Sequence, residues 1–176
     1  MLFDCGEGAQ RQMMKAKFSY MRVNHIFITH LHCDHFLGVA GVLQTLSLTH
    51  RKTPIHIYGP EGTTNEVEKL LQIGVYGLRF EVISTDLSSG ERVEIEPGKW
   101  VRTTYVDHDT PSLAYALEEA PRPGRVDLGK ARVHGIEPGP LLGILHREEP
   151  VTLPGGRVVT PSMVCGPPRR GRKIVV

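Results

Sequence analysis

The sequence predicts a layered α/β fold, and three observations lead to this expectation. The first part of the chain alternates short apolar runs with helix-like stretches, which is typical of parallel strands joined by helices. Later strand-like runs follow one another directly, separated by glycine and proline, as in an antiparallel meander. The composition, with 40% hydrophobic and 23% charged residues, is ordinary for a globular domain.

The expected elements follow from these patterns. A helix is expected over residues 9–17, after a glycine-rich turn, and another directly after the histidine-rich run that ends at residue 35. A third helix is expected from Thr63, because Thr63 and Glu66 have the spacing of a capping box. The strand-like runs are residues 2–3, 26–29, 54–58, 80–83, 93–95, 101–106 and 113–117.

The character of the chain changes between residues 119 and 156. Many prolines and glycines interrupt regular structure there, and several cations make the stretch basic. Such a long irregular segment is uncommon inside a domain and is usually either functional or disordered. From composition alone, a solvated surface excursion is the simpler interpretation. In both cases we expect a segment that packs poorly.

Bulk properties exclude few classes of protein. No apolar run approaches the roughly 20 residues that span a bilayer, so we expect no membrane segment. The net charge of +2 is too small to indicate nucleic-acid binding by itself. Cys5, Cys33 and Cys165 are odd in number and widely separated, which favours a reducing, cytoplasmic location. Both ends lie in strand-like runs, so we expect a piece of a longer protein.

The strongest functional signal is the run His30-Leu31-His32-Cys33-Asp34-His35. Three imidazoles and a carboxylate are ligands that zinc favours. Closely spaced imidazoles repel when protonated, so the run is best explained by neutral rings that hold a cation. It follows a buried strand, and the carboxyl ends of strands are where α/β proteins commonly place their sites. The alternative, that these histidines only cap or pack, fits each one singly better than all of them together.

The spacing suggests how the donors divide between ions. His30 and His32 can face one ion if the loop turns, whereas Asp34 and His35 are better placed for a second. Two adjacent metals can clamp a phosphate and activate a bound water. His108, in a loop after a predicted strand, is a candidate to complete the first site, although a single loop histidine is more often a surface residue.

These residues carry a resemblance to a known family. The run from His30 to His35 resembles the signature motif of the metallo-β-lactamase superfamily. Within it, the whole chain resembles the ribonuclease Z family, endonucleases that remove the 3′ trailer from precursor tRNA. The similar segments are residues 2–10, 36–38, 106–115, 139–140 and 166–172.

The resemblance implies a fold and a set of metal ligands. Residues 1–176 would form part of an αββα sandwich. His30, His32 and His108 would hold one zinc ion, and Asp34 and His35 the other. A metal-activated hydroxide would attack the phosphodiester, with Asp34 also acting as general base.

Further residues near the metal gain roles from the same resemblance. Asp4 corresponds to a carboxylate that orients a metal-binding imidazole. The alternative for Asp4 is an ordinary turn-forming residue. Gly6 and Gly8 would let the backbone pass close to the site. Cys33 is expected to be a packing residue that points away from the metals.

The resemblance also gives residues 119–156 a function, as a protruding arm that grips tRNA, often across a homodimer. Its cations would neutralise phosphates and contribute salt-dependent affinity. The RNA-binding residues expected on it are Arg122, Arg125, Lys130, Arg132, Gly139 and Pro140.

The family has sequence before residue 1 and a second half that completes the metal sites. Two zinc ions are therefore expected in the full-length protein, and this chain alone is expected to be weakly active or inactive. One alternative function is that of another hydrolase of the superfamily, acting on a small phosphodiester, a thioester or a lactam. A non-catalytic RNA-binding relic is the other. Manganese is an alternative to zinc at such sites.

Overall fold

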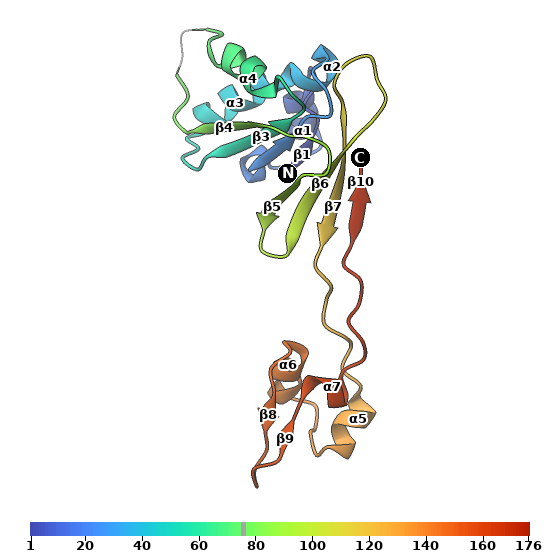
Figure 1. Ribbon diagram of the computed structural model, residues 1–176. Helices are drawn as coiled ribbons and strands as arrows, with labels where there is room; N and C mark the ends of the chain where they lie inside the picture. Colours follow the sequence, from blue (N-terminus) through green and yellow to red (C-terminus); the bar gives the residue numbers. More distant parts are fainter. Residues whose placement is uncertain (75–76) are drawn as a thin grey trace. The chain divides into compact units, whose positions relative to one another are not determined.

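The computed structural model describes residues 1–74 and 77–176, which divide into two compact units (Figure 1). Unit 1 consists of Met1–Glu118 together with Ile174–Val176, and unit 2 consists of Glu119–Lys173.

The first sheet of unit 1 is parallel and has the strand order β1-β2-β3-β4. Apart from His56, the interior positions of β2 and β3 are apolar on both faces, and Ile26, Phe27 and Ile57 have no exposed surface. Burial on both faces explains the nearly continuous apolar runs in the sequence. The strands are β1 (Leu2–Phe3), β2 (His25–Phe27), β3 (Ile55–Gly59) and β4 (Val82–Asp86).

Helices cover one face of this sheet. Ile26, Ile28, Ile55 and Ile57 form a core cluster with the buried faces of α3 and α4. α1 packs against α3, and a short 3₁₀ helix at Tyr20–Arg22 leads into β2. The helices are α1 (Ala9–Lys15), α2 (Cys33–Phe36), α3 (Gly38–Leu48) and α4 (Thr63–Leu71).

A second sheet covers the opposite face. Its strand order is β10-β7-β6-β5, and the core between the sheets includes Phe27, Tyr58, Leu113 and Tyr115. The hydroxyl of Tyr115 donates a 2.6 Å hydrogen bond to the Ile28 carbonyl and so joins the sheets. Unit 1 thus supplies a helix layer and two sheets, three of the four layers of the expected sandwich. The strands are β5 (Arg92–Glu96), β6 (Lys99–Tyr105), β7 (Leu113–Glu119) and β10 (Lys173–Val175).

Two details of unit 1 differ from the sequence analysis. The run at 80–83 was expected to begin the meander but leads into β4 of the parallel sheet. β4 runs parallel to β3 because α4 returns the chain to the end of the sheet at which β3 begins. The prediction of a capping box at Thr63 was also wrong. Gly62 precedes α4 in a left-handed conformation, and the carboxylate of Asp86 accepts hydrogen bonds from the backbone N–H groups of Gly62 and Thr64.

Unit 2 has a core of its own, so the expectation of poor packing was wrong. Its helices are α5 (Leu128–Val133), α6 (Pro140–His146) and α7 (Pro161–Val164), and β8 (Val151–Thr152) pairs with β9 (Val158–Val159). Pro140 and Pro161 lie at the starts of helices, where a missing N–H costs nothing. The unit extends to Lys173, beyond residue 156. Its buried core residues are Ala131, Ile136, Leu145, Val151, Val159 and Val164.

In the part of the chain that the structure describes, every helix is too short or too polar to cross a bilayer.

Candidate metal centre

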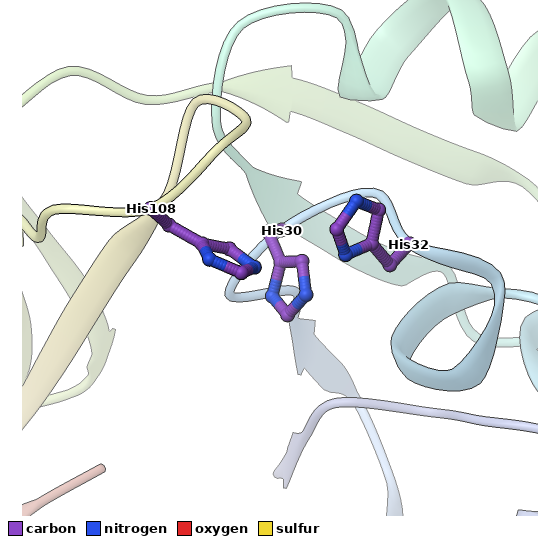
Figure 2. Close-up of side chains that lie close together, drawn as sticks. All are labelled: His30, His32 and His108. Carbon is purple, nitrogen blue, oxygen red and sulfur yellow. The ribbon is translucent and has the colours of Figure 1, made fainter.

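Three histidines from two loops of unit 1 come together (Figure 2). His30 and His32 lie on the loop between β2 and α2, and His108 lies on the loop between β6 and β7. One ligand atom from each ring lies within 4.8 Å of the other two. The ring centroid of His30 is 4.8 Å from that of His32 and 4.7 Å from that of His108. Two loops that lie more than 70 positions apart in the sequence thus contribute to one three-donor group.

Backbone hydrogen bonds hold the loops in register. The N–H of Leu113, at the start of β7, donates a 2.8 Å bond to the Thr29 carbonyl, which places the loop of His108 beside that of His30. The N–H of Cys5 donates a 2.7 Å bond to the His35 carbonyl. The chain after β1 is thereby joined to α2, next to the loop of His30 and His32.

Two glycines make this close approach possible. A Cβ atom on Gly6 would lie 1.8 Å from the Asp34 carbonyl oxygen, and one on Gly38 would lie 1.9 Å from the Gly6 carbonyl oxygen. The expected close approach therefore holds for Gly6 but not for Gly8. At Gly8 a Cβ meets nothing within 4 Å, and the residue instead supplies a φ of 76° before α1.

Asp4 lies at the centre of a hydrogen-bond network beneath these rings. Its carboxylate accepts bonds from the Thr29 N–H at 2.7 Å and from the Thr29 hydroxyl at 2.9 Å. It also lies 2.7 Å from Nδ1 of His35. Asp4 has a φ of 54°, a left-handed conformation that aspartate tolerates better than most residues. The backbone turn at Asp4 therefore brings its carboxylate into contact with both Thr29 on the loop and His35 on α2.

Asp34 and His35 lie next to the three-histidine group but outside it. The His35 ring centroid is 4.0 Å from that of His30, and His35 Nε2 is 3.6 Å from an Asp34 carboxylate oxygen. The Asp34 side chain is 81% exposed, so this carboxylate is open to solvent and to a substrate. Asp34 and His35 thus form a neighbouring pair outside the group of three.

Electrostatics favour a neutral ring at His30, the buried member of the group. His30 is only 8% exposed. Burial first, and then the neighbouring rings of His35, His108 and His32, lower the pKa of His30 below its usual value. Neutral imidazole is the form that binds a metal ion.

The sequence analysis missed two residues of this site. Asp109 approaches Nε2 of His108 at 3.3 Å and Nε2 of His32 at 3.7 Å. Thr29 connects Asp4 to His30, and its hydroxyl is 2.9 Å from His30 Nδ1. The available signals were a carboxylate directly after one candidate ligand and a hydroxyl directly before another. The expectation for Cys33 was wrong, because this residue is exposed on α2 rather than packed.

The residues expected to contact RNA lie in unit 2. Arg122, Arg125, Lys130 and Arg132 are all exposed, and Arg132 is also 3.8 Å from the Glu137 carboxylate. Gly139 and Pro140 form the start of α6. Unit 2 contains ten Lys and Arg against five Asp and Glu, and unit 1 contains eleven against fourteen. The net charge of the chain is small because the excess of anions in unit 1 offsets part of the excess of cations in unit 2.

Comparisons with known proteins identify the family and the fold of this chain. Residues 1–113 match the family model described as Anti-Pycsar protein Apyc1. Proteins named ribonuclease Z from Methanosarcina acetivorans and Myxococcus xanthus are 49% and 44% identical to the chain over 99% and 100% of its length. The chain spans 57% of the length of each.

Solved structures show the same fold. The crystal structure of human tRNase Z, short form, matches 66% of this chain and 53% of its own chain, with a TM-score of 0.60 and 31% identity. The metallo-β-lactamase fold protein YhfI from Bacillus subtilis matches 70% of this chain and 51% of its own, with a TM-score of 0.51 and 13% identity. The chain is therefore a member of the family described as Anti-Pycsar protein Apyc1, it has the metallo-β-lactamase fold, and its resemblance to ribonuclease Z is confirmed.

Proposed function

We propose that this protein is a zinc-dependent endoribonuclease that removes the 3′ trailer from precursor tRNA. The observation that carries the proposal is the convergence of His30, His32 and His108 in a chain that aligns along its whole length with proteins named ribonuclease Z. Its similarity to human tRNase Z, short form, supports the same activity.

The donors present fit a zinc ion. Three imidazoles within 4.8 Å of one another are a common protein ligand set for a catalytic zinc, which keeps a further position open. His30, His32 and His108 would hold this ion, and Asp34 and His35 would contribute to a second. Zinc supplies Lewis acidity that polarises a phosphate and lowers the pKa of a nearby water.

The chain's own residues can serve the chemistry in distinct ways. Asp34 would take the proton from an attacking water, and the exposure of its carboxylate supports this role. Attack at phosphorus breaks the bond to the 3′ oxygen and leaves a 3′ hydroxyl on the tRNA. Asp4 orients the His35 ring through their 2.7 Å contact.

Unit 2 is proposed to bind the tRNA. Its excess of cations suits the phosphate backbone, and structured RNA is read mainly by shape and by backbone contacts. The candidate RNA-binding residues are all exposed: Arg122, Arg125, Lys130, Arg132, Gly139 and Pro140. We further propose that the protein works as a homodimer in the cytoplasm.

A second candidate is a hydrolase of the same fold that acts on a small phosphodiester. The observation that favours it is that the family match ends at residue 113 and leaves unit 2 outside. The two candidates predict different substrates. Bis-p-nitrophenyl phosphate tests the metal site alone, whereas precursor tRNA needs both units.

The first experiment is elemental analysis of the purified chain, with His30→Ala as the comparison. We expect one tightly bound zinc ion per chain, lost in His30→Ala, and a second ion that binds weakly because only Asp34 and His35 are proposed to hold it. Manganese in place of zinc would correct the identity of the metal. Absence of any bound metal from the unaltered chain would refute the zinc proposal.

The second experiment measures cleavage of precursor tRNA and of bis-p-nitrophenyl phosphate. The chain alone is expected to be weakly active or inactive on precursor tRNA, and a protein of the relatives' full length is expected to cleave it 3′ to the discriminator nucleotide. Cleavage of the small ester without cleavage of RNA by that longer protein would favour the second candidate. RNA binding without either activity would indicate a non-catalytic relic.

A further inference from the structure

Thr29 occupies a position between the Asp4 carboxylate and the His30 ring. Its hydroxyl oxygen lies 2.9 Å from an Asp4 carboxylate oxygen and 2.9 Å from His30 Nδ1. Its backbone N–H donates a 2.7 Å bond to the other carboxylate oxygen of Asp4. The backbone N–H and the hydroxyl of Thr29 therefore both contact Asp4, and only the hydroxyl also contacts a proposed metal ligand, His30.

The number of available protons determines the direction of these bonds. An ionised carboxylate can only accept, whereas a hydroxyl has one proton to donate and lone pairs with which to accept. A bond to a charged acceptor is stronger than one to a neutral acceptor, so the Thr29 proton points to Asp4. The Thr29 oxygen is then an acceptor towards His30, and the hydrogen of that bond must come from Nδ1.

We propose that Thr29 is a positioning residue that transmits the orientation of Asp4 to His30 and holds its proton on Nδ1, so that Nε2 keeps the lone pair for a metal ion. The same carboxylate acts directly on His35, whose Nδ1 lies 2.7 Å from Asp4. One anion thus fixes the ring orientation of a residue in each donor set, directly for His35 and through a hydroxyl for His30.

The backbone around Thr29 supports this role. Its carbonyl accepts the 2.8 Å bond from Leu113 that joins the loop of His108 to the loop of His30. The side chain and the backbone of one residue therefore set the orientation of His30 and the position of the segment that carries His108. The inference rests on the proposed metal site and not on the proposed RNA substrate.

The test compares three variants of the purified chain. Thr29→Val keeps the branched shape but removes the hydroxyl, and Thr29→Ser restores it. Asp4→Asn keeps a residue that tolerates positive φ but removes the charged acceptor. Thr104→Val, at an exposed threonine on β6, is the matched control for the substitution itself.

The first readout is the tautomer of the histidine rings in the metal-free chain, measured by long-range proton–nitrogen correlation NMR at a pH where the rings are neutral. We expect the proton on Nδ1 of both His30 and His35 in the unaltered chain and in Thr29→Ser. Thr29→Val should release His30 alone, whereas Asp4→Asn should release both rings. A proton on Nε2 of His30 in the unaltered chain would overturn the inference.

The second readout is zinc affinity by competition with a chelator. We expect Thr29→Val to weaken zinc binding by about 10-fold to 100-fold, the usual effect of removing a partner of a metal ligand. Thr29→Ser and Thr104→Val should stay within about threefold of the unaltered chain. Unchanged affinity in a folded Thr29→Val chain would also overturn the inference.

These readouts separate the inference from the proposed function. Correct tautomers and zinc affinities in a protein that does not cleave precursor tRNA would leave the role of Thr29 intact and refute the activity. Circular dichroism of each variant identifies a loss of fold. If Thr29→Val does not fold, the His30 tautomer in the unaltered chain and its change in Asp4→Asn provide the remaining test.

Discussion

Units 1 and 2 differ in how their functional residues are held. In unit 1 the candidate ligands lie on two loops and on α2, which are fixed by backbone hydrogen bonds, by a left-handed Asp4 and by glycines that admit no Cβ atom. In unit 2 the candidate RNA-binding cations are exposed, and among Arg122, Arg125 and Lys130 the structure records no ion pair. A metal site needs fixed donor positions, whereas a phosphate-binding surface needs mainly charge.

The largest expected effect comes from breaking the backbone contact beneath the metal loop. Gly38→Ala would place a Cβ atom 1.9 Å from the Gly6 carbonyl oxygen, so α3 or the loop must move. We expect a loss of unfolding free energy of about 3 kcal/mol or more, together with loss of metal binding. Urea denaturation followed by circular dichroism measures the first and elemental analysis the second.

The matched control is Gly41→Ala in the same helix. There the new Cβ would meet only a side-chain oxygen of Gln10 at 3.4 Å, an ordinary contact. Because alanine is the better helix former, we expect no loss and a gain of up to about 1 kcal/mol. Equal destabilisation by both substitutions would show that the close approach at Gly38 does not matter.

A smaller effect is expected from unit 2, and it should concern RNA affinity rather than stability. Replacing Arg122, Arg125 and Lys130 by glutamine should weaken precursor tRNA binding by about 100-fold at moderate salt. The slope of log affinity against log salt should fall by about 2 to 3, because each phosphate contact contributes about 0.7–0.9. Binding measured over a series of salt concentrations checks both values.

A triple glutamine variant of Lys52, Lys69 and Lys99 in unit 1 makes the same change in net charge. It should change the affinity and the slope much less. If the two triple variants behave alike, the cations of unit 2 act only through net charge and the difference between the units disappears.

The smallest effect concerns the response of unit 1 to pH. His25 stacks on His56 with ring centroids 5.2 Å apart. Burial first, and then His56, lower the pKa of His25 below its ordinary value of 6.5. The folded chain therefore takes up this proton less readily than the unfolded chain does. The contribution of neutral His25 to the free energy of unfolding is complete above about pH 6.5. It is lost as the pH falls towards the lowered pKa of this ring.

The variant His25→Gln should reduce the loss of unfolding free energy between pH 7.5 and 5.5 by less than about 1 kcal/mol, since solvent screens a partly exposed group. Urea midpoints at both pH values, with a chelator present, measure it. His146→Gln, at an exposed residue of α6, should leave the pH dependence unchanged. An equal effect at both positions would assign it to general charge rather than to burial.

The sequence predicted local features well and relationships across the chain poorly. The strand at Leu2–Phe3 is confirmed, because it depends on a short apolar run followed by glycine. The predictions for the position of β4 and for the cap of α4 were wrong. Both features depend on β4 pairing with β3, which brings Asp86 to the start of α4. Neither contact has a signal near Thr63 or residue 80.

The same division applies to the candidate site. His30, His32 and Asp34 could be selected from spacing alone, and His108 from its position after a strand. Thr29 and Asp109 could not, because a hydroxyl or a carboxylate beside a ligand is common and only the fold shows which atoms it reaches. The packing of unit 2 was missed because its apolar residues are spread between prolines and glycines without a helical or strand period.

The pairing of β7 with β10 bears on the order in which the chain folds. Tyr115 and Val176 exchange two 2.9 Å backbone hydrogen bonds, although the 55 residues of unit 2 lie between them in the sequence. Joining two strands across an unfolded stretch of that length costs loop entropy and slows folding. Unit 2 shortens the search, because the Glu119 N–H bonds the Arg172 carbonyl at 2.9 Å and Arg122 pairs with Arg169. Early folding of unit 2 would therefore bring the two strands together and accelerate closure of the second sheet.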